Sequence, residues 1–445
     1  MKRLFLSIVC LALAGATFSC VHRGADQSAP APAPSAAAQP AVAAAEDVET
    51  AFPILGWGWL GTANHLGLDT NPDFYREMAD CGFTIAGFAS NDAQVAAAKE
   101  AGIQVFYMDG RISNKDWATL DIEQFRKDLA EINEQWKDEP TVRGYYLQDE
   151  PRAAALDGLA AACQIVREVA PDKDPYVNLF SNSTQLYNYA PLSYEEYVEK
   201  VMASNPAPNT GYDQYVFYED NHVRETLFSC CEVFRRLSLK HHKAWWYCGL
   251  SIAHRNYAVP TYAQLSLAAW SAIAYGAKGL AWFTYLDGNR TGWHSAPLNA
   301  YGDRTPTWYR LKQVNRAVQS QAEVLLRLRN DRTYHFGSTV PESNERLNGP
   351  DAGSLIVGAL NGNHWLVGEF THEQTGERYL VVVNTDMTHS NEFTPVWREG
   401  KAPSQVRVRL MQLNPAEIPF NRTPNDTNIF EPGGAAVLHL IYDQK

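Results

Sequence analysis

Residues 143–169 read RGYYLQDEPRAAALDGLAAACQIVREV, and this stretch contains the unit from which the fold is predicted. Its first part, Arg143–Leu147, is a short apolar and aromatic run with the length of a buried strand. Its last part, Ala153–Val169, repeats apolar residues with the period of an amphipathic helix. We therefore predict one strand followed by one helix, with Pro151 in the connection between them.

The same alternation recurs before and after this unit. We predict eight strands, at residues 54–59, 83–88, 103–108, 143–147, 176–180, 212–217, 244–249 and 279–285. We predict helices after them, at residues 71–81, 95–101, 122–136, 153–169, 194–203, 222–239, 262–275 and 308–328. Eight such units within residues 51–329 have the size and count of an α/β (β/α)8 TIM barrel. A doubly wound sheet is the alternative, but no glycine-rich phosphate loop follows the first strand.

The helical period disappears after residue 330. Short β-rich runs follow, separated by turn signals such as Asn361-Gly362-Asn363 and Gly433-Gly434. These runs lie at residues 355–357, 364–370, 379–384, 406–411 and 436–442. We predict that residues 330–445 form an all-β sandwich domain.

The segment before the barrel predicts export. Lys2 and Arg3 precede the apolar stretch Leu4–Ala16, which is too short for a permanent membrane span. It ends at Thr17-Phe18-Ser19-Cys20, which resembles a bacterial lipoprotein signal, in which the cysteine becomes the lipidated first residue. We predict that residues 1–19 are a signal peptide and that Cys20 is lipidated; an ordinary cleaved signal is the alternative.

Residues 20–50 are rich in Ala and Pro and have no apolar periodicity. Such a composition predicts a semi-rigid tether, because proline favours extended backbone. The expected location is the bacterial outer membrane or cell surface, or facing the periplasm, with membrane contact through the lipid anchor only.

Composition excludes several classes of protein. Of the 445 residues, 45% are hydrophobic and 20% are charged, which is enough apolar material for a large core. The net charge of −12 argues against a nucleic-acid partner. The cysteines beyond the leader, at positions 81, 163, 230, 231 and 248, lack the spacing of a metal site. With no metal or nucleotide motif, we expect no cofactor; the sequence makes no prediction of oligomeric state.

The predicted strand ends carry the candidate site, because TIM-barrel active sites lie at the carboxyl ends of the strands. The candidate catalytic residues are Glu150, Asp149 and Asp213. The candidate substrate-binding residues are Trp57, Trp59, Asn178, Tyr215, Trp246, Trp282, Tyr285 and Asp287, with His65 and His254 also at this end. This mixture suits a sugar, since its apolar faces stack on aromatic rings and its hydroxyls bond to carboxylates and amides.

Glu150 is the candidate general acid. Pro151 favours extended backbone at the residue before it, and Asp149 raises the cost of ionising Glu150. A carboxyl group kept protonated near neutral pH is able to protonate a leaving glycosidic oxygen. The alternative is that Asp149 or Glu150 caps the helix that follows.

Several motifs resemble one known group of proteins. They are YYLQDEP at 145–151, SYEEYV at 193–198, YDQYVF at 212–217, GAKGLAWF at 276–283, YLVVVN at 379–384 and EPGG at 431–434. Over residues 51–445 the chain resembles the (β/α)8 glycoside-hydrolase-like surface lipoproteins of bacteria, whose barrel is often followed by a β-sandwich. The resemblance implies hydrolysis of an oligosaccharide or polysaccharide, with Glu150 as the acid/base residue after strand four.

Two positions depart from that pattern. The clan usually carries Asn before the acid, where this chain has Asp149, and its nucleophile is a Glu ending strand seven, where residues 244–250 read AWWYCGL. Three alternatives stay open. The second carboxylate is Asp213, Glu219 or Asp287; or Asp149-Glu150 resembles hexosaminidases with substrate-assisted catalysis, in which Asp149 orients a 2-acetamido group and Tyr215 assists; or the protein binds a glycan without hydrolysing it.

Overall fold

The computed structural model describes residues 50–182, 188–205, 210–220, 223–224, 226–288, 290–336, 348–360, 364–411, 416–421 and 426–443. The predicted signal peptide, Cys20 and the tether up to residue 49 lie outside the described residues. Residues 49–445 form one compact unit. Within the described part of the chain, no helix combines the length and the apolar character that a membrane crossing requires.

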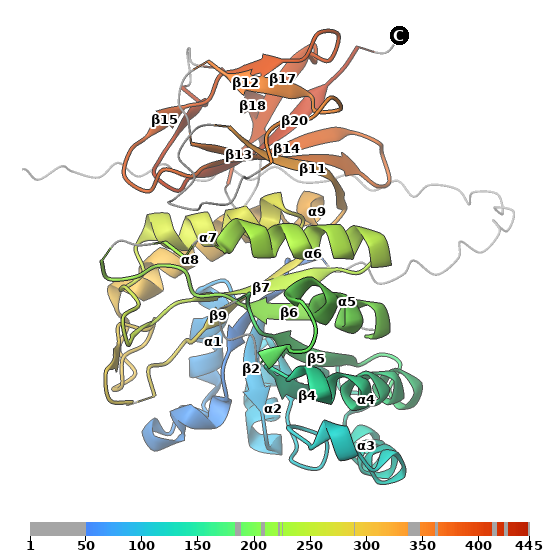
Figure 1. Cartoon of the computed structure of the whole chain (residues 1–445). Coiled ribbons are helices and arrows are strands. Elements are labelled where there is room, and N and C mark those ends of the chain that lie inside the picture. The colour runs from blue at the N-terminus through green and yellow to red at the C-terminus, as the bar shows by residue number, and fades with distance from the viewer. Residues whose placement is uncertain are drawn as a thin grey trace, which may run out of the picture. The chain divides into compact units, whose positions relative to one another are not determined.

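Eight parallel strands close into a barrel (Figure 1). They are β1 (Ile54–Trp57), β2 (Ile85–Ala89), β3 (Gln104–Tyr107), β4 (Val142–Asp149), β5 (Asp174–Leu179), β6 (Thr210–Asp213), β7 (Trp245–Leu250) and β9 (Gly279–Phe283). The last strand pairs with the first, with Leu55 opposite Ala281. The closed barrel confirms the predicted TIM fold and excludes the doubly wound sheet.

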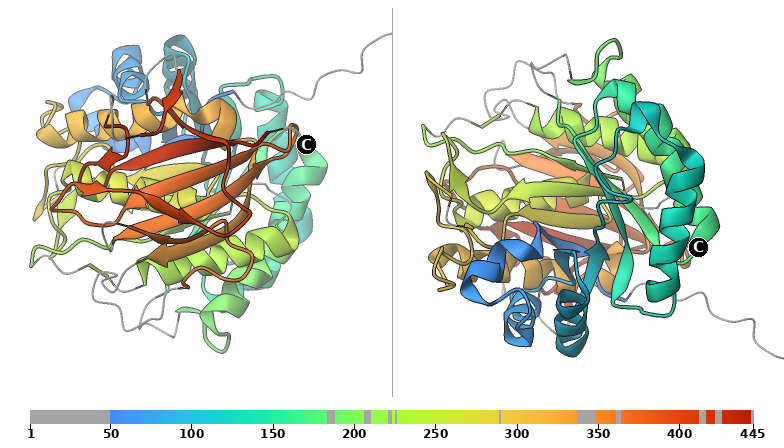
Figure 2. Two further views of the ribbon diagram at one scale, coloured as in Figure 1. Left: turned by 90° about the horizontal axis from the view of Figure 1, so that it is seen from above. Right: turned by 90° about the horizontal axis from the view of Figure 1, so that it is seen from below.

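Helices surround the barrel (Figure 2). They are α1 (Pro72–Asp80), α2 (Asp92–Ala101), α3 (Ile122–Trp136), α4 (Leu156–Val169), α5 (Tyr194–Ser204), α6 (Leu227–His241), α7 (Tyr262–Ala274), α8 (Pro306–Ser320) and the short α9 (Ala322–Leu325). Local signals begin several of them: the Asn71 side chain caps α1, and Ser193 and Thr261 form capping boxes at α5 and α7.

Alternation along the strands gives the barrel two apolar layers. Leu55, Phe106, Tyr146, Tyr176 and Trp246 pack together in one cluster inside the barrel. Their neighbours, Tyr145, Val177, Tyr212, Tyr247 and Leu280, belong instead to the core between strands and helices. The parity of a residue within its strand therefore decides whether its side chain can reach the barrel mouth.

The C-terminal region is antiparallel β structure, as predicted. Its main sheet has the order β11 (Leu328–Phe336), β13 (Trp365–His372), β14 (Arg378–Asn384), β20 (Ala435–Ile441), β17 (Gln405–Arg409) and β18 (Glu417–Pro419). Two small sheets pair β12 (Ile356–Ala359) with β16 (Pro395–Trp397) and β15 (Asn391–Glu392) with β19 (Ile429–Phe430).

The main sheet packs on the barrel through α7, as the view from above in Figure 2 illustrates. In β14, Val381 and Val383 join the core of the barrel helices, whereas Leu380 and Val382 join a separate cluster on the other face of the sheet. Both faces of this sheet are therefore apolar, which explains the continuous apolar run in β14.

Several predicted element ends differ from those observed. The predicted helix 308–328 is divided into α8 and α9, and the chain enters β11 at Leu328. Lys278 Nζ donates to the carbonyls of Leu325 and Leu328, which provides partners for carbonyls released where the helix ends. The predicted boundary between residues 329 and 330 falls inside β11, and the division into domains stays a prediction.

Candidate active site

The carboxyl end of β4 presents Asp149 and Glu150, and β5 holds both in place. Asp149 is opposite Asn178 in the ladder, and Asn178 Nδ2 donates to Asp149 Oδ1 over 2.9 Å. The Glu150 backbone N–H donates to the Asn178 carbonyl over 2.8 Å. Asn178 itself is 1% exposed. A rigid strand thus positions two neighbouring carboxylates at the barrel mouth.

The prediction of extended backbone at Glu150 is wrong. Its φ is +46°, in the left-handed region that non-glycine residues rarely adopt. The reason is that the Glu150 N–H still bonds to β5, so the chain has to leave the strand at this residue to reach the 3-10 helix η3 (Ala153–Ala155). Such conformations cost about 1–3 kcal/mol and cluster at functional sites.

The helix-cap alternative for these carboxylates is also contradicted. The residue before η3 is Arg152 and the residue before α4 is Ala155, and neither helix start has a side-chain cap. Glu150 instead lies at the open end of β4, where the residue is in part exposed to solvent. The two carboxylates are therefore available for another role.

Asp213 is the third carboxylate of the cluster. It ends β6 opposite Cys248 of β7, and a hydrogen bond from the Tyr215 side chain reaches it. Its Oδ1 atom is buried and has no hydrogen-bond partner among the described residues, as is also true of Asn178 Oδ1. Burial, followed by the charges of Glu150 and Asp149, raises the pKa of Asp213 well above its usual value. The site therefore favours the protonated form of Asp213.

The other two carboxyl groups are shifted in the same direction. Burial raises the pKa of Asp149 to about 6, against the opposing effect of the Asn178 hydrogen bond. Burial and then the neighbouring Asp149 charge raise the pKa of Glu150 to about 7. Near pH 6.5 the pair thus combines an ionised Asp149 with a largely protonated Glu150.

Buried and half-buried aromatic rings line the mouth beside these carboxylates. Trp57, 4% exposed, packs edge-to-face on Trp59 and Phe283, with centroids 5.4 Å away in each case. Phe283 stacks on Tyr215 with centroids 5.7 Å apart. The strand-end analysis missed Phe283, although its parity with the inward-facing Ala281 was a usable signal.

Three predicted substrate-binding aromatics lie elsewhere. Trp246 is in the barrel interior with Arg143 over its ring at 5.4 Å. Trp282 points outward and its Nε1 donates to Asn315 Oδ1 of α8 over 2.9 Å. Tyr285 accepts a bond from Trp308 Nε1 over 3.0 Å and is 3% exposed. These side chains are packing residues, so their assignment to the substrate site is corrected.

Asp287 and Glu219 are the remaining candidates. Asp287 is buried, and its backbone N–H donates to the Leu298 carbonyl over 3.2 Å. Glu219 is exposed, with its N–H bonded to the Asn256 carbonyl. Each of these residues belongs to a connection rather than to a strand end.

A small two-stranded sheet, β8 (Ala253–His254) with β10 (Trp293–His294), brings the predicted His254 together with Trp293, which the sequence analysis missed. The His254 and Trp293 rings stack with centroids 4.2 Å apart, and His254 lies 6.1 Å from the Tyr215 ring. Trp293 is far along the chain from any strand end, and only the folded connection brings it to the site.

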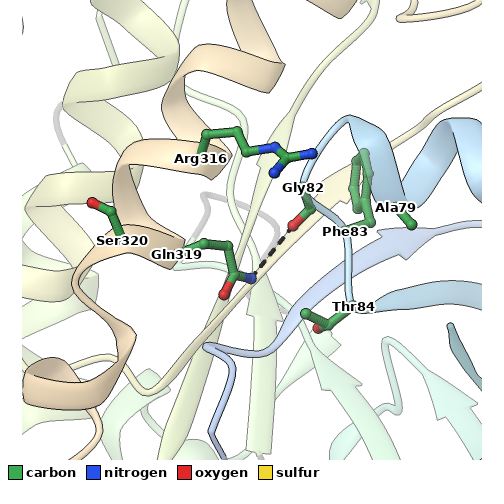
Figure 3. Close-up of a pocket in the computed structure, with 7 residues that line it drawn as sticks. All are labelled: Ala79, Gly82, Phe83, Thr84, Arg316, Gln319 and Ser320. Carbon is green, nitrogen blue, oxygen red and sulfur yellow. Dashed lines mark hydrogen bonds between the residues drawn. The ribbon is translucent and has the colours of Figure 1, made fainter. Parts of the chain in front are cut away.

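A pocket at the opposite end of the barrel has a structural explanation. Figure 3 shows Arg316 and Gln319 of α8 pointing toward the turn that precedes β2, whereas the Ser320 hydroxyl points away from it. Gln319 accepts from the Phe52 N–H over 3.0 Å and donates to the Phe52 carbonyl over 2.7 Å, so it clamps the entry to β1. Nowhere in the described ranges do three or more His, Cys, Asp or Glu side chains form a metal-binding group.

Comparison with known proteins identifies the architecture. A scan against protein-family models gives no match, and a search of curated proteins gives none either. Among solved structures, a family 42 β-galactosidase from G. stearothermophilus, solved as a catalytic mutant, is similar with a TM-score of 0.57 and 8% identity, over 88% of this chain and 98% of that one. A family 5 glycoside hydrolase from Bacteroides vulgatus has a TM-score of 0.52 and 10% identity, over 88% and 89%.

A β-galactosidase from Marinomonas ef1 matches with a TM-score of 0.45 and 10% identity over 61% of this chain, which spans 60% of the length of that one. The chain thus has the TIM-barrel fold seen in glycoside hydrolases, followed by a C-terminal β region.

Proposed function

We propose that this protein is a glycoside hydrolase in which Glu150 is the general acid. One observation carries the proposal: Asp149, Glu150 and Asp213 converge at the carboxyl end of a TIM barrel, where burial raises all three pKa values and neighbouring carboxylate charges raise those of Glu150 and Asp213 further. Stability alone does not require such a cluster, because three neighbouring carboxylates oppose one another's ionisation.

The arrangement assigns a role to each group. Glu150, in part exposed to solvent and with a pKa of about 7, donates its proton to the leaving glycosidic oxygen. Asn178 and Asp213 each have one buried oxygen without a partner in the part of the chain that the structure describes, and a sugar hydroxyl would satisfy either atom. Tyr215 and Phe283 offer half-buried ring faces for stacking.

Asp149 is the better candidate for the second carboxylate. Strand β7 ends at Leu250, and the raised pKa of Asp213 disfavours the ionised form that a nucleophile needs. Asp149 ionises at lower pH than Glu150 and is held by Asn178. This favours a substrate-assisted N-acetylhexosaminidase, in which Asp149 orients the 2-acetamido group that attacks the anomeric carbon.

The test is hydrolysis of a panel of aryl glycosides, N-acetylhexosaminides included, by the wild type and by Glu150→Gln. The variant keeps the shape of the side chain and removes its proton, so we expect the rate to fall by about 10²–10⁴ on substrates with poor leaving groups. On dinitrophenyl glycosides, which depart without protonation, the loss should be far smaller. A wild-type rate for Glu150→Gln on a natural glycoside would exclude Glu150 as the acid.

Asp149→Asn distinguishes the two mechanisms. A substrate-assisted enzyme acts on 2-acetamido sugars and loses that activity in the variant. A two-carboxylate enzyme tolerates the change better, because Asn is the usual residue at this position in the clan that the chain resembles. If the wild type binds glycans but hydrolyses none of the panel, the protein is a glycan-binding lipoprotein.

We also propose export and lipid anchoring at Cys20, on the sequence features of residues 1–20. Cys20→Ala should release the protein from the membrane fraction of the producing bacterium into the soluble fraction. Unchanged membrane association of the variant would place the anchor elsewhere.

A further inference from the structure

A continuous group of rings leads outward from Asp213 over the barrel mouth. Tyr215, which hydrogen-bonds to Asp213, lies 5.8 Å from the Tyr257 ring and 6.1 Å from the His254 ring. His254 in turn stacks on Trp293 at 4.2 Å. These rings come from the connections after β6, β7 and β9, so three separate loops build one wall of the mouth.

Three arginines, here called the arginine rim (Arg224, Arg255 and Arg290), surround this wall. Arg224 Nη2 donates to the Tyr257 hydroxyl over 2.9 Å, and the Arg290 guanidinium lies 4.8 Å from the Trp293 ring centroid. Burial and then the charges of Arg255 and Arg290, against a backbone hydrogen bond, lower the pKa of His254 to about 4. The positive charges of Arg255 and Arg290 thus act directly on the His254 ring.

Phenol hydroxyls, rather than carboxylates, accept the hydrogen bonds of Arg224. It is half-buried and donates to Tyr218 over 2.7 Å as well as to Tyr257, and among the described residues it forms no ion pair. The Tyr257 hydroxyl is neutral near pH 7, because burial raises its pKa to about 12. A partly desolvated guanidinium that lacks an anionic partner is a site for an anion.

The charge distribution of the mouth is therefore divided. One side holds the three carboxyl groups, of which Asp149 ionises first as the pH rises, and the arginine rim makes the adjacent wall basic. A neutral sugar has no charged group that this arrangement of carboxyl groups and arginines could orient. An acidic sugar unit does, because its anionic group would be repelled by the carboxylates and attracted by the arginines, which fixes its orientation.

We propose that the arginine rim binds an anionic substituent, a uronate carboxylate or a sulfate ester, on the glycan that occupies the proposed active site. The inference rests on the proposed function for the position of the glycan. Arginine suits both anions, since its planar fork donates two parallel hydrogen bonds to carboxylate or sulfonyl oxygens.

The test measures binding to the catalytically disabled Glu150→Gln protein by calorimetry. The probes are galacturonate, glucuronate and mannuronate oligomers, each paired with its esterified neutral counterpart, and three sulfated oligosaccharides, each paired with its desulfated form. We expect at least one acidic probe to bind about ten-fold or more tightly than its neutral partner, with an advantage that shrinks in high salt. Whether the carboxylate or the sulfate series shows the advantage identifies the anion.

Variants locate the effect. Arg290→Gln and Arg255→Gln change exposed side chains, so folding is not at risk, and together they should remove most of the advantage of the acidic probe. Arg224→Gln should remove about ten-fold, and Arg224→Lys should restore part of it by keeping the charge. The matched control is Arg236→Gln on α6, an exposed arginine paired with Glu195 on the outer helices, which should change nothing.

The outcomes separate this inference from the proposed function. Equal binding of acidic and neutral members of every pair, or no binding of any acidic probe, overturns the anionic subsite, while hydrolysis of a neutral glycoside by the wild type would leave the glycosidase standing. Rim-dependent binding of an acidic probe that the wild type does not hydrolyse supports the subsite and contradicts the glycosidase.

Discussion

The two ends of the barrel treat their buried polar groups differently. At the amino-terminal end, Lys173 Nζ donates to the carbonyls of Glu139 and Val142, over 2.8 Å and 2.7 Å. Gln319 there satisfies both the N–H and the carbonyl of Phe52. These side chains have partners in the chain itself, as expected where polar groups serve stability.

At the carboxyl-terminal end, the buried atoms without such partners among the described residues include carboxyl and amide oxygens, whereas those at the amino-terminal ends of β6 and β7 are the hydroxyl of Thr210 and the indole N–H of Trp245. Oxygens of Asn178 and Asp213 are buried and unbonded within the described residues, and Asp213 lies beside two more carboxylates. Each feature costs stability, since a buried acceptor without a partner costs about 1–3 kcal/mol. The difference indicates that the amino-terminal end is built for folding and the carboxyl-terminal end for a ligand, which the following predictions test.

The largest effect should come from the amino-terminal end. Gln319→Leu leaves the N–H and carbonyl of the fully buried Phe52 without partners. We expect the free energy of unfolding to fall by about 2–4 kcal/mol, from two unsatisfied groups. Urea denaturation measures this loss, and kcat/KM on the best aryl glycoside should be unchanged below the unfolding transition.

Ser320→Ala is the control for that variant, because Ser320 lines the same pocket but has only local partners among the described residues: its hydroxyl donates to the Ala317 carbonyl and accepts from Gln321 Nε2. It should change stability by less than about 0.5 kcal/mol. A Gln319→Leu protein that is fully stable but inactive would contradict the division between the two ends.

The carboxyl-terminal end should respond in the opposite direction. Asp213→Asn removes a carboxyl whose pKa is raised by burial, so the variant should be more stable at neutral pH, by about 1–3 kcal/mol. In the wild type, the unfolded carboxyl ionises above about pH 4 while the folded one stays protonated, so stability falls as the pH rises. The gain should therefore be near zero at pH 4 and grow toward pH 7.

Urea denaturation at both pH values measures this gain, with Asp303→Asn as an exposed control that should show none. The activity of Asp213→Asn then tests whether Asp213 acts in its protonated or its ionised form. Asparagine resembles a protonated aspartate in shape, so substantial activity in Asp213→Asn agrees with a protonated role, whereas complete loss would show that Asp213 acts as an ionised second carboxylate.

The sequence predicted the barrel because its periodicity is local. Each strand–helix unit shows its own apolar pattern, and the predicted bounds of 122–136 agree with α3 (Ile122–Trp136). The positions of the three carboxylates were also predictable from the sequence, because Asp149 and Asp213 each end a strand and Glu150 directly follows one.

Other features depend on tertiary contacts. Trp282 was assigned to the site although its neighbours Ala281 and Phe283 are the inward-facing residues of β9, and a one-residue error in parity exchanges the two faces. The stack of His254 on Trp293 joins two connections, and no local pattern predicts which loops will meet. The left-handed backbone at Glu150 arises from its bond to β5, which outweighs the preference imposed by Pro151.

The smallest effect, a shift along the pH axis, tests the pairing at the carboxyl-terminal end most directly. If Asp149 acts ionised and Glu150 protonated, kcat/KM should peak between about pH 6 and about pH 7, falling on the acid side as Asp149 gains a proton and on the basic side as Glu150 loses one. Asp149→Asn removes the charge that, after burial, raises the pKa of Glu150. The basic limb of any residual activity should therefore move down by about one pH unit.

In Glu150→Gln the basic limb should instead disappear, since the titrating proton is gone. The control is Asp303→Asn, which should keep the wild-type profile. A basic limb that stays in place in Asp149→Asn would mean that the two carboxylates do not influence each other, and the distinction between the two ends of the barrel would then rest on Asp213 and Asn178 alone.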